Sequence, residues 1–482
     1  MKDLASLAVD TASSRGAEYA DARLILMQHE EVRFKNGEPA GLDQSESAGV
    51  GIRVLVRGAW GFAATDDLTR EGISRCAALA VDIGRASARL VADPVRLAPE
   101  PPHRAVWTSE CRIDPFTVPL ARKVDLLARI DAELRRVGGV RNAESSLTFV
   151  REHQWFLSTE GSDIEQTLTR SGGGYTATAV RDGDIQRRSF PAAEGHHLCR
   201  GYEFIESVPW VENAGRIAEE AVALLSAEQC PPGTYDIVLD GSQLALQIHE
   251  SVGHPSELDR VLGMEANYAG TSFLTLDKRD TLQFGSPIVN LIADATLPAG
   301  LATFAFDDEG VEAQRWPIVE GGRFRAYLTS RELAHRVGEG RSRGCVRADG
   351  WHHIPMIRMV NLSLLPGRGT LEELLEDTGT GLYLETNRSW SIDQLRYNFQ
   401  FKTEVAWEIR GGKRVRMLKN PTYQGITTRF WNSCDSICGD SEWRPWGIVN
   451  CGKGQPGQVA DMTHGAAPAR FRNVKVGAGY ES

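Results

Sequence analysis

The chain has 482 residues, which favours two or more domains, because a single hydrophobic core rarely keeps growing beyond about 250–300 residues. Hydrophobic residues make up 41% and charged residues 24%, a composition typical of a protein that buries a sizeable core. The formal net charge of −10 argues against general nucleic-acid binding and gives no reason to expect attraction to an anionic membrane.

Neither a secretory signal nor a membrane span is predicted. The N-terminal run MKDLASLAVD is amphipathic and carries Asp3 and Asp10, whereas a secretory signal begins with basic residues and continues with an unbroken apolar run. Apolar residues nowhere continue for the roughly 18 positions that indicate a transmembrane helix. We therefore expect a cytoplasmic protein.

The eight cysteines are scattered over the whole chain, so a disulfide framework is not expected. Most of them are predicted to be buried free thiols that pack as small hydrophobic residues. Any exception is expected to be a metal ligand or a nucleophile.

Helical and strand-like segments alternate in the first half of the chain. Apolar residues recur at helical spacing in residues 2–14, 69–90, 121–137 and 213–228. Asn36-Gly37 separates two alternating runs, as a hairpin turn requires, and strand-like runs dominate residues 146–190.

The run Cys230-Pro231-Pro232-Gly233 is typical of a linker, so we place a domain boundary between residues 229 and 230. Short strands and turns fill the second half, apart from two predicted helices at residues 242–252 and 371–376. The sequence thus predicts an α+β fold. Residues 1–229 form a domain of helices and antiparallel sheet, and residues 230–482 form a mostly antiparallel β domain that carries a short, distorted metal-binding helix.

The run His-Glu-Ser-Val-Gly-His contains His249, Glu250 and His254, near the end of a helix whose predicted N-cap is Ser242. Two imidazoles beside a carboxylate suit a hydrolytic zinc site. Imidazole nitrogens hold zinc at about 2.0–2.1 Å, and the carboxylate can take a proton from the bound water. A string of this kind also arises by chance, with histidines that bind no metal.

The two histidines are five residues apart, whereas the common zinc-binding helix has them four apart on one face. Five residues turn an ideal α-helix through about 500°, which leaves the second side chain roughly 140° away from the first. Both can reach one ion only if the helix widens or breaks between them. Gly253 gives the backbone local freedom and Pro255 disfavours a regular helix at His254, so we predict a distorted turn at Val252-Gly253.

The stretches HESVGHPSELDR and NCGKGQPGQVADMTHGAAPARFRNVKVG resemble the TldD/PmbA family of metallopeptidases. The resemblance extends to EVRFKNGEPAGLDQSESAGVGIRVLVRGAWGFAATDDLT and to IPMIRMVNLSLLPG, so it covers nearly the whole chain. It implies that His249, His254 and Cys451 bind one zinc ion per subunit and that Glu250 is the catalytic base. Metal-free members of the PmbA or TldE type lack this set, so the sequence resembles the metal-retaining TldD type.

Other residues leave alternatives open. A separate structural zinc site is conceivable from Cys434, Cys438, Cys451 and His464, although cysteines at this spacing usually pack in a core. His464 is also compatible with orienting the metal-bound cysteine, with binding substrate or with an ordinary structural hydrogen bond. Three tryptophans are expected to line a peptide groove or to lie in the core or a dimer interface: Trp431, Trp443 and Trp446. The sequence assigns no role to Asp393 or Arg358.

The residues and the resemblance together predict a zinc peptidase that cleaves peptides or flexible segments, with Glu250 as the general base. The resemblance implies a homodimer or a heterodimer with a metal-free homologue, and no nucleic-acid or membrane partner is expected. Two alternatives remain: a non-catalytic partner subunit, and a zinc enzyme acting on a non-peptide amide.

Overall fold

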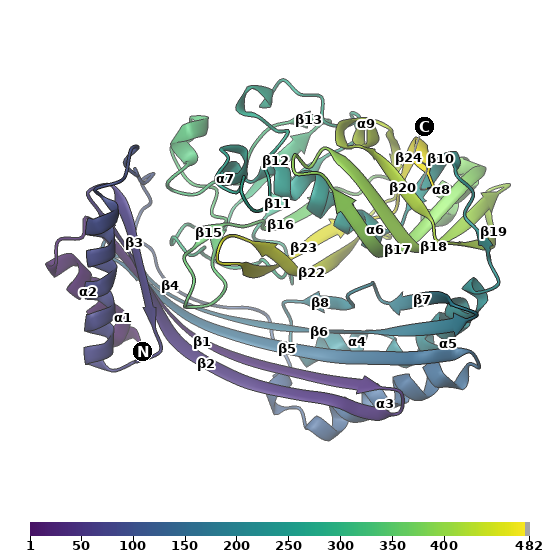
Figure 1. Cartoon of the computed structure of the whole chain (residues 1–482), viewed down its shortest axis with the longest axis horizontal. Helices are drawn as coiled ribbons and strands as arrows, with labels where there is room; N and C mark the ends of the chain where they lie inside the picture. The colour runs from purple at the N-terminus through teal and green to yellow at the C-terminus, as the bar shows by residue number, and fades with distance from the viewer. Residues whose placement is uncertain (478–482) are drawn as a thin grey trace.

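A long, curved and mostly antiparallel sheet runs along the lower side of the computed structural model in Figure 1, in which residues 1–477 are described. Helices cover its outer face, namely α3 (Leu120–Arg136), α4 (Tyr202–Ser207) and α5 (Trp210–Leu224). At one end, where the strands bend, lie α1 (Lys2–Ser14) and α2 (Arg70–Ser87). The second half of the chain packs over the opposite, concave face.

The strands of this first sheet are β1 (Tyr19–Lys35), β2 (Glu38–Val56), β3 (Ala59–Thr65), β4 (Arg104–Thr108), β5 (Val140–Ser158), β6 (Asp163–Arg181), β7 (Asp184–Phe190) and β8 (His196–Leu198). Their order is β3-β2-β1-β5-β6-β4, with β7 and β8 also paired to β6. Buried and half-buried side chains alternate along β6, because successive residues of a strand point to opposite faces.

The predicted hairpin turn at Asn36-Gly37 is confirmed. Asn36 has φ 51° and Gly37 has φ 94°, the positive values that a two-residue turn between twisted strands requires. The Asn36 side chain also accepts a hydrogen bond of 2.8 Å from the backbone N–H of Ala143 on the neighbouring strand. The turn therefore connects β1 and β2 and is anchored to β5.

A second sheet dominates the other half of the chain. Its strands are β9 (Glu228–Gln229), β10 (Gly233–Leu239), β17 (Thr380–Ile392), β18 (Asn398–Arg410), β19 (Lys413–Lys419), β20 (Thr422–Ile426), β21 (Cys434–Ile437) and β24 (Ala469–Val476). Because β17 pairs with both β10 and β18, the path β17-β10-β24-β20-β18 closes on itself as a small barrel.

Shorter strands complete the second half. One sheet has the order β13-β12-β11-β16, built from β11 (Leu291–Asp294), β12 (Arg315–Glu320), β13 (Arg323–Phe324) and β16 (Asn361–Leu364). Two hairpins are β14 (Val346–Arg347) with β15 (Met356–Ile357), and β22 (Arg444–Lys453) with β23 (Gln458–Ala466). The predicted α+β fold, with its β-rich second half, is confirmed. The domain boundary between residues 229 and 230 remains a prediction.

The second half contains more helix than predicted. Besides α6 (Gly241–Ile248) and α8 (Leu371–Thr378) it has α7 (Leu258–Val261) and α9 (Thr427–Asn432). The sequence analysis missed α7 and α9 because helices of four and six residues are too short to show a helical period. Short 3-10 turns lie at Pro115–Thr117, His254–Ser256, Leu276–Lys278 and Ala334–Val337.

All eight cysteines fall within residues 1–477 and are free thiols, seven of them buried and Cys111 half-buried, as expected. Among the described helices, none combines the length and the apolar character needed to cross a membrane.

Buried ion pairs attach the first sheet to the second half of the chain. Arg53 of β2 donates to Asp21 of β1 at 2.8 Å and to Glu309 of the second half at 3.2 Å. The three side chains are between 0% and 4% exposed. A second pair joins Arg23 of β1 to Asp308 at 3.4 Å. Charges removed from water in this way depend on each other, because a single unpaired member would be strongly unfavourable.

Replacing Arg53 with alanine should therefore leave two buried carboxylates, Asp21 and Glu309, without their common partner. We expect a loss of about 3–5 kcal/mol of stability, measured by urea denaturation. The control is Arg75→Ala, because Arg75 and Asp67 form an exposed pair (71% and 39% exposed) that water screens, so its loss should leave stability nearly unchanged. Equal effects of the two substitutions would contradict the importance of the buried pairs.

Candidate metal site

The helix that carries the predicted metal ligands begins at Asp240. The Asp240 carboxylate accepts hydrogen bonds from the backbone N–H groups of Ser242 (2.9 Å) and Gln243 (3.2 Å). The predicted N-cap at Ser242 was therefore wrong by two residues. A carboxylate is favoured at this position because its negative charge also interacts with the positive end of the helix dipole.

After α6 the backbone widens into a π turn over His249–Gly253, and a 3-10 turn follows at His254–Ser256. The predicted distortion at Val252-Gly253 is confirmed, although it involves all five residues of the turn. A Cβ atom at Gly253 would lie 1.9 Å from the Sδ atom of Met359, so any larger residue there would force the Met359 side chain to move. The widened turn brings the two imidazole rings within 4.8 Å, measured between centroids.

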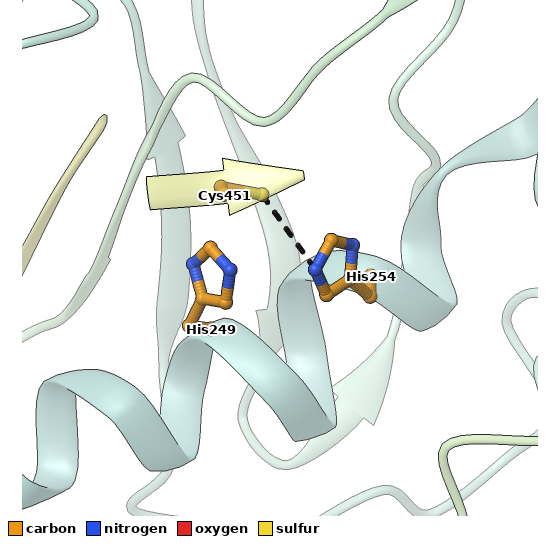
Figure 2. Close-up of side chains that lie close together, drawn as sticks. All are labelled: His249, His254 and Cys451. Atoms are coloured by element: carbon orange, nitrogen blue, oxygen red, sulfur yellow. Dashed lines mark hydrogen bonds between the residues drawn. The ribbon is translucent and has the colours of Figure 1, made fainter. Parts of the chain in front are cut away.

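Cys451 approaches the histidines from the hairpin of β22 and β23. Figure 2 shows His249 on the helix, His254 just beyond the turn and Cys451 on the strand above them. One possible ligand atom from each residue lies within 4.8 Å of the others, and Cys451 Sγ is 3.7 Å from His254 Nε2. All three residues are only 3–4% exposed. The fold thus gathers the three predicted metal ligands into one buried group.

His464 decides which ring nitrogen of His249 carries the proton. His249 Nδ1 lies 2.8 Å from His464 Nε2, and His464 Nδ1 lies 3.0 Å from the carbonyl oxygen of Leu362. A carbonyl can only accept, so His464 Nδ1 must carry a proton. Burial holds the pKa of His464 well below its usual value, so the ring is neutral and its Nε2 accepts from His249 Nδ1. His249 therefore presents a free lone pair on Nε2.

Glu257 decides which ring nitrogen of His254 carries the proton. Its Oε2 atom accepts from His254 Nδ1 at 3.0 Å, and its Oε1 atom lies 3.3 Å from Lys453 Nζ. Burial alone would raise the pKa of the Glu257 carboxyl, but Lys453 and His254 outweigh burial and hold it well below its usual value. The carboxylate therefore stays charged, and His254 also presents Nε2 as a lone-pair donor.

The donor set fits a zinc ion. Burial lowers the pKa of His249 to about 4 and also lowers that of His254, so both rings are neutral near pH 7. Burial would raise the pKa of the Cys451 thiol, but His254 and Arg358 outweigh burial and the net pKa is lowered. Two imidazole nitrogens and one thiolate are ligands that Zn²⁺ prefers, and they leave a fourth position for water or substrate.

Glu250 lies beside this group and is 5% exposed. Its carboxylate Oε2 forms an ion pair with Nη1 of Arg396, which belongs to the turn between β17 and β18. Arg358, which had no predicted role, donates to the backbone carbonyl oxygens of Cys451 and Gln458 and so fixes the hairpin.

The structure also bears on the alternative roles that the sequence left open for the cysteines and for Trp431. Cys434 and Cys438 are buried in hydrophobic cores, and among residues 1–477 only His249, His254 and Cys451 form a three-donor group, so a separate zinc site was a wrong alternative. Trp431 is fully buried in the core.

The sequence analysis missed Glu257, Lys453 and Arg396. Lys453 nevertheless lies in the stretch NCGKGQPGQVADMTHGAAPARFRNVKVG, which carries the resemblance to the family.

Comparison with family models covers most of the chain. The model described as PmbA/TldA metallopeptidase C-terminal domain matches residues 232–478. The corresponding models for domain 1 and for the central domain match residues 20–84 and 113–227.

Individual relatives agree with these matches. A metalloprotease of Methanothermobacter thermautotrophicus is 31% identical over 470 residues, covering 95% of each chain. A zinc metalloprotease TldD homolog of Saccharolobus solfataricus is 26% identical over 249 residues, covering 51% of this chain and 52% of its own. The fold is shared with the solved structure of TldE from Thermococcus kodakarensis, with a TM-score of 0.76 at 14% identity, covering 98% of this chain and 100% of that one. With matches along its length and a relative of 31% identity over nearly all of it, this chain belongs to the PmbA/TldD family of metallopeptidases.

Proposed function

We propose that the protein is a zinc-dependent peptidase in which His249, His254 and Cys451 hold the metal and Glu250 is the general base. The observation that carries this proposal is the buried three-donor group, in which both histidines have Nε2 available and the thiol pKa is lowered. The name of the Saccharolobus relative, a zinc metalloprotease, supports zinc as the metal.

Zinc bound by these ligands would supply a Lewis acid for the peptide carbonyl and lower the pKa of water. Glu250 takes a proton from the attacking water while the water oxygen bonds to the carbonyl carbon and the C=O π electrons move to the carbonyl oxygen. When those electrons return and the C–N bond breaks, Glu250 gives the proton to the leaving nitrogen. The products are a carboxylic acid and an amine.

Peptides and flexible polypeptide segments are the proposed substrates. The ligand side chains and Glu250 are only 3–5% exposed, so a compact folded surface could not reach them, whereas an extended segment could enter after a small rearrangement. We extend the proposal to a cytoplasmic dimer, formed with a second copy or with a metal-free homologue. The shared fold with TldE supports such pairing. A non-catalytic subunit is disfavoured because this chain retains the His-Glu-His set.

Zinc content and peptide cleavage test the proposal directly. Purified wild-type protein should hold about one zinc per chain and cleave members of a peptide library, detected by mass spectrometry. Glu250→Gln should keep the zinc and lower kcat by about 10²–10⁴-fold, because the amide cannot accept the proton. His249→Ala should lose zinc as well as activity. Wild-type protein that takes up no zinc after dialysis against it would contradict the proposal.

Metal removal gives an independent test. A chelator should abolish cleavage by removing the ion, and added Zn²⁺ should restore it. Zinc that is retained while only non-peptide amides are cleaved would instead support the alternative amide hydrolase.

His464, the hydrogen-bond partner of His249, should affect zinc affinity. His464→Phe removes the acceptor of His249 Nδ1–H, and we expect zinc to bind about 10–100-fold more weakly in a competition titration with a chelating dye. His464→Gln should recover part of the affinity, because an amide can both accept from His249 and donate to Leu362. His335→Phe is the control, since His335 is exposed in a 3-10 turn. An unchanged affinity in His464→Phe would show that the hydrogen-bonded pair is unimportant for the metal.

A further inference from the structure

The turn between β17 and β18 is built around Asp393. The Asp393 carboxylate accepts hydrogen bonds from the backbone N–H groups of Tyr397 at 2.7 Å and Asn398 at 3.1 Å. Its carbonyl oxygen accepts from the backbone N–H of Arg396 at 2.9 Å, and Arg396 has φ 62°. A non-glycine residue rarely adopts this left-handed conformation unless its surroundings enforce it, so the hydrogen bonds of the turn hold the Arg396 backbone in place.

The same turn is also anchored from outside. The segment that follows the metal-binding helix donates two backbone hydrogen bonds to it, from Thr271 to Gln394 at 3.0 Å and from Phe273 to Leu395 at 2.9 Å. The hydroxyl of Thr427 donates to the carbonyl oxygen of Arg396 at 2.9 Å. Hydrogen bonds from two other segments of the chain therefore hold the turn that contains Arg396.

The Arg396 guanidinium has more hydrogen-bond donors than partners. Its side chain is 16% exposed, and its Nη1 atom bonds to Glu250 Oε2. The Nε atom is buried and has no hydrogen-bond partner, and within residues 1–477 Glu250 is the side chain's sole hydrogen-bonding partner. Buried donors without partners are rare in native proteins. A planar guanidinium carries five N–H bonds, so it can hold Glu250 and a second oxygen at the same time.

We propose that Arg396 is a catalytic residue that donates a hydrogen bond to the carbonyl oxygen of the bond being cleaved, and that Asp393 is the positioning residue that holds it there. This inference rests on the proposed peptidase function. Glu250 must lie within hydrogen-bond reach of the attacking water, and that water forms a bond to the carbonyl carbon. The carbonyl oxygen is one bond away from that carbon, so a guanidinium bonded to Glu250 is close enough to contact it.

The charge changes match this role. As the water oxygen bonds to carbon, the C=O π electrons move to the carbonyl oxygen, which becomes negative, and the Arg396 N–H bonds stabilise that charge. When the C–N bond breaks, the electron pair on the oxygen re-forms the C=O π bond, and the leaving nitrogen takes the proton from Glu250. Donors that are already in place need no rearrangement at the moment when charge develops, which is why such groups lower the barrier.

The alternative is that Arg396 only neutralises and orients Glu250. Zinc-loaded full-length wild-type protein is compared with Arg396→Ala, Arg396→Lys, Asp393→Ala and the double variant that combines Arg396→Ala with Asp393→Ala. Arg429→Ala is the matched control, since Arg429 is an exposed arginine of α9. Three quantities are measured: kcat and KM on a library-selected peptide, the inhibition constant of a phosphinic peptide that mimics the tetrahedral oxygen, and zinc affinity.

Arg396→Ala should lower kcat by about 10²–10³-fold with little change in KM, the usual effect of removing one donor to a developing oxyanion. The phosphinic peptide should bind more weakly by a similar factor, while zinc affinity stays as in wild type. Arg396→Lys should restore part of both losses. Asp393→Ala should have a smaller effect that disappears when Arg396 is already alanine, because both substitutions remove the same interaction.

Several results would overturn the inference. Inhibitor binding that is unchanged in Arg396→Ala would leave Arg396 with no contact to the reacting oxygen, and a parallel loss of zinc affinity or thermal stability would make its role structural. Wild-type protein that neither cleaves peptides nor binds the phosphinic peptide would instead overturn the proposed function, and the role of Arg396 with it. A wild-type enzyme that cleaves peptides, with an unchanged kcat in Arg396→Ala, would overturn only the role of Arg396.

Discussion

The five-residue spacing between His249 and His254 is the constraint on which the site depends. A regular helix would point these side chains in directions roughly 140° apart, so the backbone has to widen by one residue to bring them together. The π turn does this, and Gly253 within it packs directly against Met359. The metal site is thus tied to the packing of this turn against the segment between β15 and β16, which contains Met359.

A single hairpin supplies most of what the helix lacks. The β22–β23 pair contributes Cys451 as a donor, His464 as the partner of His249 and Lys453 as the partner of Glu257. A metal-binding histidine usually has its second ring nitrogen hydrogen-bonded, and the identity of that partner decides which nitrogen is free for a metal. The helix therefore sets the direction of the ligands, and the hairpin sets their protonation.

Charged groups removed from water recur throughout the molecule. Arg53 and Arg23 attach the first sheet to the second half, Lys453 stabilises Glu257, and Arg396 faces Glu250. In each pair, removing one member would leave the other charge without its partner in a largely buried place. The second half packs over the concave face of the long curved sheet (Figure 1). Glu250 and the three-donor group of His249, His254 and Cys451 are enclosed within it, at only 3–5% exposure.

Local features could be predicted from the sequence because they depend on neighbouring residues. The hairpin turn at Asn36-Gly37, the longer helices and the distortion around Val252-Gly253 follow from backbone preferences and from helix geometry. The N-cap was predicted at Ser242 instead of Asp240. The helices α7 and α9 were missed, because a few residues carry too weak a periodic signal.

The contacts that complete the site depend on the tertiary structure. Cys451 is 197 residues from His254, His464 is 215 residues from His249, and Arg396 is 146 residues from Glu250. Only the resemblance indicated Cys451, and the sequence did not indicate Arg396 at all. The physical reason is that a residue's spacing along the chain determines its direction on a helix or strand, whereas the closure of the barrel and the packing of the hairpin determine which distant side chain it meets.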